Sequence, residues 1–143
     1  MQFSITDNSP ATRKRLDALI RRYQQNKKPA MTAAILQAQT IIKTRTAKGV
    51  DVDGAPFKPY SKTYAAFRSK KGLSTTPDLM FRGAMMASMK ATASKNEGVL
   101  FFNTSENAKK AAFNNRTRRF FDLSKKELTR IQQVYFRRLT RER

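Results

Sequence analysis

The excess of positive charge constrains this chain more than any other feature of its sequence. Thirty lysines and arginines stand against ten aspartates and glutamates, which gives a net charge of +20 over 143 residues. Charges of one sign held within one compact domain repel each other and oppose folding. We therefore expect an acidic partner in use, which charge alone leaves open between nucleic acid, an anionic membrane and the acidic face of another protein.

The length and the apolar content predict one domain over residues 1–143. A chain of this size can bury a core of its own. Its apolar residues include ten Phe and six Met but no Trp, which favours helices packed against a modest sheet over a large sandwich. No apolar run is long enough to cross a bilayer, and the first residues lack the basic-then-apolar order of a signal peptide. We expect a soluble cytoplasmic chain without membrane contact.

The residue types argue against enzymatic chemistry. The chain contains neither His nor Cys, so it lacks the commonest general base, a thiolate nucleophile and the usual zinc ligands. The sequence DVDG at residues 51–54 resembles the start of a calcium loop, but the third ligand position is Ala55 and the twelfth is Lys62. The other carboxylates are scattered, and there is no glycine-rich phosphate loop. We expect no enzyme, no metal and no cofactor.

The first 44 residues predict a short strand over residues 2–6 and then two helices. Ser9 and Pro10 form a helix start, because Ser caps a helix and Pro fits its first position. Pro29 is expected to end this helix, and a second, antiparallel helix is expected over residues 30–44. The first helix carries an apolar stripe at helical spacing, formed by Leu16, Leu19, Ile20 and Tyr23.

The middle of the chain predicts loops around short elements. Helical periodicity disappears over residues 45–61, where Gly, Pro and charged residues predict a turn-rich loop. A short helix is expected over residues 62–69 and a mobile polar connector over residues 70–77. A further helix is then expected to begin at Asp78, as its cap, and to run to Met89.

The last third contains the clearest local signals. Two strands, residues 91–94 and 99–103, flank a turn with Gly98 and predict a hairpin. A short helix over residues 106–114 and an extended piece over residues 118–122 are expected next. Ser124 and Glu127 then form a capping box for a final helix, whose apolar stripe is Leu128, Ile131, Tyr135 and Leu139.

Two surfaces are candidates for partner binding. The loop over residues 45–61 is too polar for a core and too long for a neutral connector, so we expect it to contact a partner through Phe57 and Tyr60. The basic faces of two helices are expected to meet acidic protein surfaces. They comprise Arg13, Lys14, Arg15, Arg21 and Arg22 on the first helix, and Arg130, Arg137, Arg138 and Arg141 on the last.

Non-specific nucleic-acid binding through the basic C-terminal helix is the alternative. From residue 109 onwards the net charge is +9, and aromatic residues are interleaved as in a single-strand stacking platform. Their spacing favours the core for most of them, and no motif for sequence-specific DNA reading is visible. The residues concerned are Phe113, Phe120, Phe121, Tyr135 and Phe136.

Three segments in order carry a family resemblance: RTAKGVDVDGAPFKPYS at residues 45–61, DLMFRGAMMASM at residues 78–89, and RRFFDLSKKEL at residues 118–128, with the hairpin between the last two. This arrangement resembles the virion morphogenesis (tail completion) family of Mu-like tailed phages. It is similar, more distantly, to tail components with the HK97 gene-product-ten-like fold. One departure is residues 111–116, which read AAFNNR where the family has a His-Gln-x-Gly-like stretch.

The resemblance implies a structural role in a virion. It implies an α+β subunit, with long helices packed against a small antiparallel sheet, in a ring of the neck or upper tail that completes or terminates the tail and helps to join it to the head. A sixfold ring is expected, in contact with other neck and tail proteins, with a lumen through which DNA could pass. In that setting the chain is assembled in the host cytoplasm, and the loop over residues 45–61 and the connector over residues 70–77 are docking elements.

Overall fold

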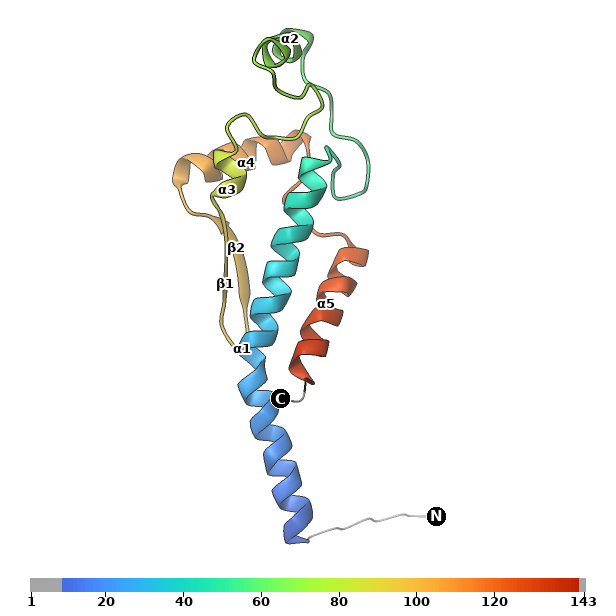
Figure 1. Cartoon of the computed structure of the whole chain (residues 1–143), viewed down its shortest axis with the longest axis vertical. Coiled ribbons are helices and arrows are strands. Elements are labelled where there is room, and N and C mark those ends of the chain that lie inside the picture. Colours follow the sequence, from blue (N-terminus) through green and yellow to red (C-terminus); the bar gives the residue numbers. More distant parts are fainter. Residues whose placement is uncertain (1–8, 142–143) are drawn as a thin grey trace.

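The computed structural model describes residues 9–141 and has the expected α+β architecture, with helices and one two-stranded antiparallel sheet (Figure 1). A long helix runs along most of the molecule, with the hairpin along one side of it, the last helix along the other, and a short helix beyond its C-terminal end. The elements are α1 (Pro10–Ala47), α2 (Lys62–Lys70), α3 (Ala84–Ala87), β1 (Met89–Ala93), β2 (Gly98–Phe102), α4 (Ser105–Thr117) and α5 (Lys125–Leu139).

Helix α1 begins as expected but does not end at Pro29. The Ser9 hydroxyl accepts a hydrogen bond from the backbone N–H of Thr12, and Pro10 occupies the first turn. The prediction of two antiparallel helices is wrong, because α1 continues through Pro29 for 38 residues. Tertiary contacts hold the helix on both sides of the proline. Asn26 donates to carbonyl groups at the C-terminal end of α5, and Ala30 is fully buried.

The buried side of α1 follows a spacing of four residues. With 3.6 residues per turn, such a row drifts by about 40° around the helix at each step. Most of its side chains are small, which lets α5 and the two strands approach α1 closely. The row consists of Asn26, Ala30, Ala34, Ala38, Ile42 and Thr46.

The hairpin is confirmed, with slightly different bounds. Strands β1 and β2 are antiparallel, and their register pairs Met89 with Phe102 and Ala93 with Gly98. The final helix is also as expected. Of residues 118–122 only Arg118 is seen to be extended, because the Phe120 backbone N–H donates to the Arg118 carbonyl at 2.7 Å in a tight turn and bends follow at residues 121 and 122. The Ser124 side chain and the Glu127 side chain form both hydrogen bonds of the capping box of α5.

The helix expected from Asp78 to Met89 is mostly absent. The described chain has only the four-residue α3 here, and Met89 already belongs to β1. Asp78 is not a helix cap, because its carboxylate accepts hydrogen bonds from Arg68 and from the backbone N–H of Met80. Gly83 has a φ angle of +73°, a left-handed conformation that interrupts a right-handed helix.

The core lies where α1, the hairpin, α3 and α4 meet, and the loop over residues 45–61 contributes to it. Phe57 is 4% exposed and belongs to the core cluster, so the expectation that it anchors a partner is wrong. Its backbone N–H donates to the Gly49 carbonyl at 2.7 Å, which folds the loop back over the end of α1. The cluster comprises Ile42, Phe57, Met85, Met86, Met89, Ala111 and Phe120.

Two further expectations have a different outcome. The strand over residues 2–6 lies outside the described residues. The mobility of the connector over residues 70–77 stays a prediction, although the connector has defined contacts: the Ser74 carbonyl accepts from Arg68, and Pro77 is buried.

Candidate docking surfaces

The N-terminal part of α1, residues 10–25, extends beyond the rest of the described molecule (Figure 1). On this part Leu16 is 55% exposed and Ile20 is 49% exposed, while Leu19 and Tyr23 are half-buried. At 100° per residue the four side chains fall within a sector of about 100°. We call them the projecting stripe. Residues 9–141 leave the side chains of Leu16 and Ile20 largely uncovered.

Basic residues flank the projecting stripe. Helical geometry places Arg13 beside one edge and Arg15 and Arg22 beside the other, with Lys14 and Arg21 toward the opposite face. All of them are exposed except Arg22, which is half-buried. This stretch therefore presents an apolar strip within a positive surface, as the charge pattern of the sequence predicts.

Helix α5 and the residues just beyond it expose the other predicted basic group, Arg130, Arg137, Arg138 and Arg141. The aromatic residues of the C-terminal third divide between core and surface. Phe120 is fully buried, as expected for a core residue, and Phe121 and Tyr135 are half-buried. The expectation of core packing is wrong for Phe113 and Phe136, which are 72% and 58% exposed.

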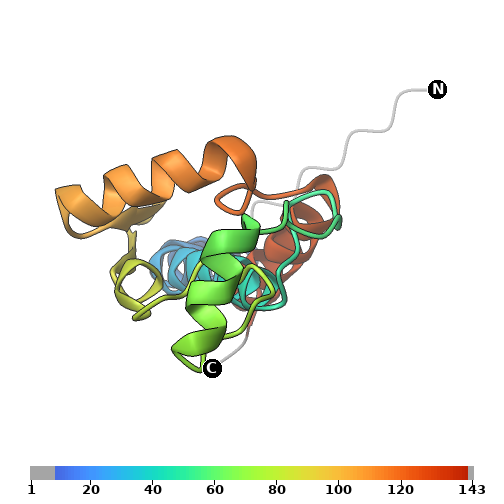
Figure 2. The same ribbon diagram turned by 90° about the horizontal axis from the view of Figure 1, so that it is seen from above.

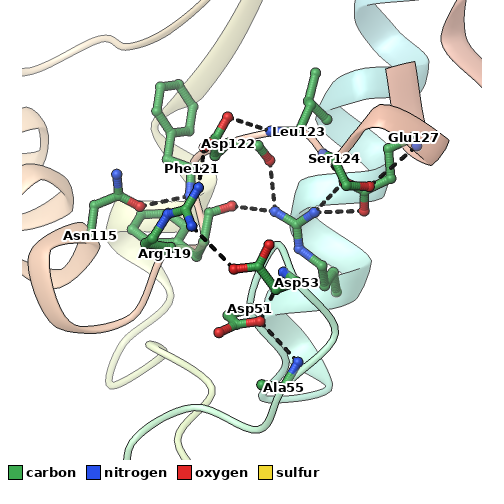
Figure 3. Close-up of polar contacts among 12 residues, drawn as sticks. Asp51, Asp53, Ala55, Asn115, Arg119, Phe121, Asp122, Leu123, Ser124 and Glu127 are labelled. Atoms are coloured by element: carbon green, nitrogen blue, oxygen red, sulfur yellow. Dashed lines mark hydrogen bonds and ion pairs between the residues drawn. The ribbon is translucent and has the colours of Figure 1, made fainter. Parts of the chain in front are cut away.

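A polar network fastens the loop and α5 to the end of α1, and Figure 3 shows its members around Glu127, Asp122 and Asp53. The Arg45 guanidinium donates to both carboxylate oxygens of Glu127 and to the carbonyls of Phe120 and Asp122. The Arg45 and Glu127 side chains are 10% and 18% exposed. Because this ion pair is enclosed and bonded on several sides, it stabilises the junction rather than offering a binding site.

The acidic turn at residues 51–54 belongs to the same network. One Asp51 oxygen accepts from the backbone N–H groups of Asp53 and Ala55, both at 2.9 Å. Arg119 bridges Asp53 at 3.1 Å and Asp122 at 2.9 Å. These contacts give the carboxylates a structural role in a turn. Among residues 9–141, no three acidic side chains gather as metal ligands do.

The network lowers the pKa of two carboxylates. Burial raises the pKa of Glu127, but hydrogen bonds from the Ser124 backbone and from Arg45 outweigh burial and hold it below its usual value. The hydrogen bond from Arg119 is the main cause of the lowered pKa of Asp122. Both groups are therefore charged at neutral pH, as the ion pairs require.

Arg68 is a buried residue that sequence reasoning missed. It is 1% exposed and donates to the Ser74 carbonyl at 2.6 Å, to Asp78 at 3.1 Å and to the Met80 carbonyl at 3.1 Å. Its guanidinium also lies 4.9 Å from the centre of the Tyr60 ring. In the sequence, Arg68 is one of several basic residues in a short helix, and nothing in that pattern indicates that it is buried.

Tyr60, the second expected anchor, is half-buried at the rim of a groove. The groove has a volume of about 600 Å³ and lies between α2, the segment before α3, and α4. Figure 2 shows α2 crossing above the end of α1, with α4 along one side. Arg118 is stacked over the Tyr60 ring at 5.1 Å.

Comparisons of the chain with models of known protein families, with curated proteins and with solved structures find no match. Within residues 9–141, none of the helices combines the length and the apolar character that a bilayer span requires. Function must therefore be inferred from the residues and surfaces described above.

Proposed function

We propose that this chain is a structural protein of a tailed-phage virion, which forms a ring in the neck, completes the tail and helps to join it to the head. The observation that carries the proposal is the projecting stripe. A helix that extends from its own domain with Leu16 and Ile20 exposed offers an apolar face to a neighbouring subunit or protein. Its basic flanks favour an acidic surface on that neighbour.

The class of fold supports the same function. The resemblance to the tail completion family implies long helices against a small antiparallel sheet, and the chain has this architecture. A ring requires a heterologous contact, in which one patch of a subunit binds a different patch of the next. A projecting helix is suited to such a contact because it reaches well beyond its own core.

Non-specific nucleic-acid binding by α5 is the second candidate, and the exposure of Phe136 among its arginines favours it. The two candidates differ in their response to salt. Nucleic-acid binding weakens steeply as the salt concentration rises, because bound counterions are released from the phosphates. A ring held by apolar contacts persists in salt.

Charge-matched double variants test the projecting stripe. Leu16→Asp/Ile20→Asp places two carboxylates on the stripe, and Ala18→Asp/Gln25→Asp places two on the opposite, exposed face of α1. All four positions are exposed or half-exposed, so we expect both proteins to fold. Each is produced together with the neck and tail proteins of the same phage, and its presence in purified particles is measured.

We expect the stripe variant to be absent from particles and the control variant to be incorporated. Normal incorporation of the stripe variant contradicts the proposal. Equal loss in both variants also contradicts it, because charge rather than the apolar stripe would then decide assembly.

A further inference from the structure

The groove beneath α2 combines aromatic rings with cations. None of the described residues that line it is a carboxylate. Four rings come from three separate segments, and the basic side chains lie among them. The lining includes Tyr60, Tyr64, Phe81 and Phe113 together with Arg68, Arg82, Lys110 and Arg118.

Two of these cations keep their charge uncompensated. Arg68 is paired with Asp78, and Lys110 with Glu106. Arg118 donates to the carbonyls of Lys58 and Pro59, at 2.9 and 3.2 Å, which orient its guanidinium without neutralising it. Arg82 forms no ion pair with a carboxylate of residues 9–141. The groove therefore attracts an anion.

Phe113 presents an uncovered ring to the groove. It is 72% exposed, and within the described residues no other ring pairs with it. Phe81, by contrast, stacks on Phe67 with ring centres 6.0 Å apart and planes 14° apart, yet it remains 41% exposed. The positions of Tyr60 and Tyr64 are explained by the packing of α2, because Arg68 and Tyr60 hold that helix in place. This packing does not explain why the Phe113 ring is exposed.

We propose that this groove binds single-stranded nucleic acid, with bases stacking on Phe113 and Phe81 and phosphates contacting Arg82 and Arg118. A groove that holds both rings and cations fits a ligand that carries both planar bases and anionic phosphates. Asn107 and Asn114 in the lining add amide groups for base edges. An acidic peptide would form ion pairs with the cations, but it would place no planar group against the exposed rings. The site is separate from α5, and it goes beyond a role in ring assembly.

Phe113→Ala and Phe101→Ala form a matched pair that tests the site. Both phenylalanines are exposed, so neither substitution should prevent folding, and Phe101 lies on β2 opposite Lys90, outside the groove and outside α5. Binding of a short fluorescent oligothymidylate to the isolated full chain is followed by anisotropy. Loss of one stacked base should weaken binding about five- to a hundredfold in Phe113→Ala, and Phe101→Ala should remain within about twofold of the unaltered chain.

A second pair tests the phosphate contact. Arg82→Gln should weaken binding and reduce the salt slope by about 0.7, while Lys95→Gln in the exposed turn of the hairpin should change neither. Equal effects within either pair overturn the proposal. If a duplex of the same length competes equally well, the proposal is also overturned, because charge alone would then be sufficient for binding. Equal competition by polyglutamate likewise overturns it, because the ligand would then be an acidic protein. Particle incorporation is measured separately, so failure here leaves the ring proposal standing.

Discussion

Arg45 holds together segments that are far apart in the sequence, and Arg68 holds together two segments that are close in the sequence. Arg45 connects α1 to the start of α5 and to the carbonyls before it, and Arg68 connects α2 to the segment that leads to α3. Both side chains are largely enclosed and each is paired with a carboxylate. Although the chain has few carboxylates, these two ion pairs allow part of its positive charge to stabilise the fold.

The Glu127 carboxylate should make folding sensitive to acid. Its pKa is lowered in the folded chain relative to the ordinary value of about 4.5, so its contribution to stability is complete above that pH. The contribution is lost as the pH falls through the lowered pKa, where the carboxylate becomes protonated. We expect the free energy of unfolding, measured with denaturant, to fall below about pH 4.5.

Glu127→Gln supplies the comparison. The variant should be less stable than the unaltered chain at neutral pH, because Arg45 loses its charged partner. Its stability should also decline less steeply in acid, with a remaining decline from Asp122. If the free energy of unfolding fell equally with pH in the two proteins, Glu127 would not be the cause of the acid sensitivity.

Phe57 is a core residue, so its truncation should unfold the chain rather than affect a partner. Phe57→Ala removes a nearly fully buried ring and should lower the free energy of unfolding by about 3–5 kcal/mol. Phe136→Ala is the control, and its exposed ring predicts a change within about 0.5 kcal/mol. Similar denaturation midpoints for the two variants would place Phe57 at the surface.

At the scale of elements, the sequence predicts those features of a helix or strand that depend on residues close together in the chain. The Ser124–Glu127 capping box, the Ser9–Pro10 start and the hairpin were all correct, because each depends on residues a few positions apart. The continuation through Pro29 and the burial of Phe57 depend on contacts with distant segments. The projecting stripe was visible in the sequence as an apolar pattern, but its exposure depends on where α5 ends.

Pro29 should destabilise α1, and its side chain should add no packing that offsets this cost. It removes a backbone N–H from the helix interior, and its side chain is exposed. Pro29→Ala restores a donor for the Gln25 carbonyl and should raise the free energy of unfolding by roughly 1–3 kcal/mol. Thermal and denaturant unfolding measure the change. A lower stability would mean that the proline itself supports contacts of α1.

At the scale of the molecule, the proposed ring requires that neighbours compensate the positive charge of each subunit. Like charges within a Debye length of ~8–10 Å repel appreciably, so subunits of +20 around a ring need acidic surfaces or DNA close by. The exposed arginines of α1 and α5 lie on faces that a neighbouring protein can reach. Strong adhesion to DNA in a lumen would hinder its passage during ejection.

High-resolution images of assembled particles test the proposed ring most directly. We expect a closed ring, sixfold in symmetry to match a tail tube, with residues 10–25 against an acidic surface of a neighbour. We also expect Arg130, Arg137 and Arg138 to face protein or solvent. A chain found only as a monomer or isolated dimer, or one whose α1 and α5 arginines line the channel and contact DNA with no acidic protein surface opposite, would contradict the proposal.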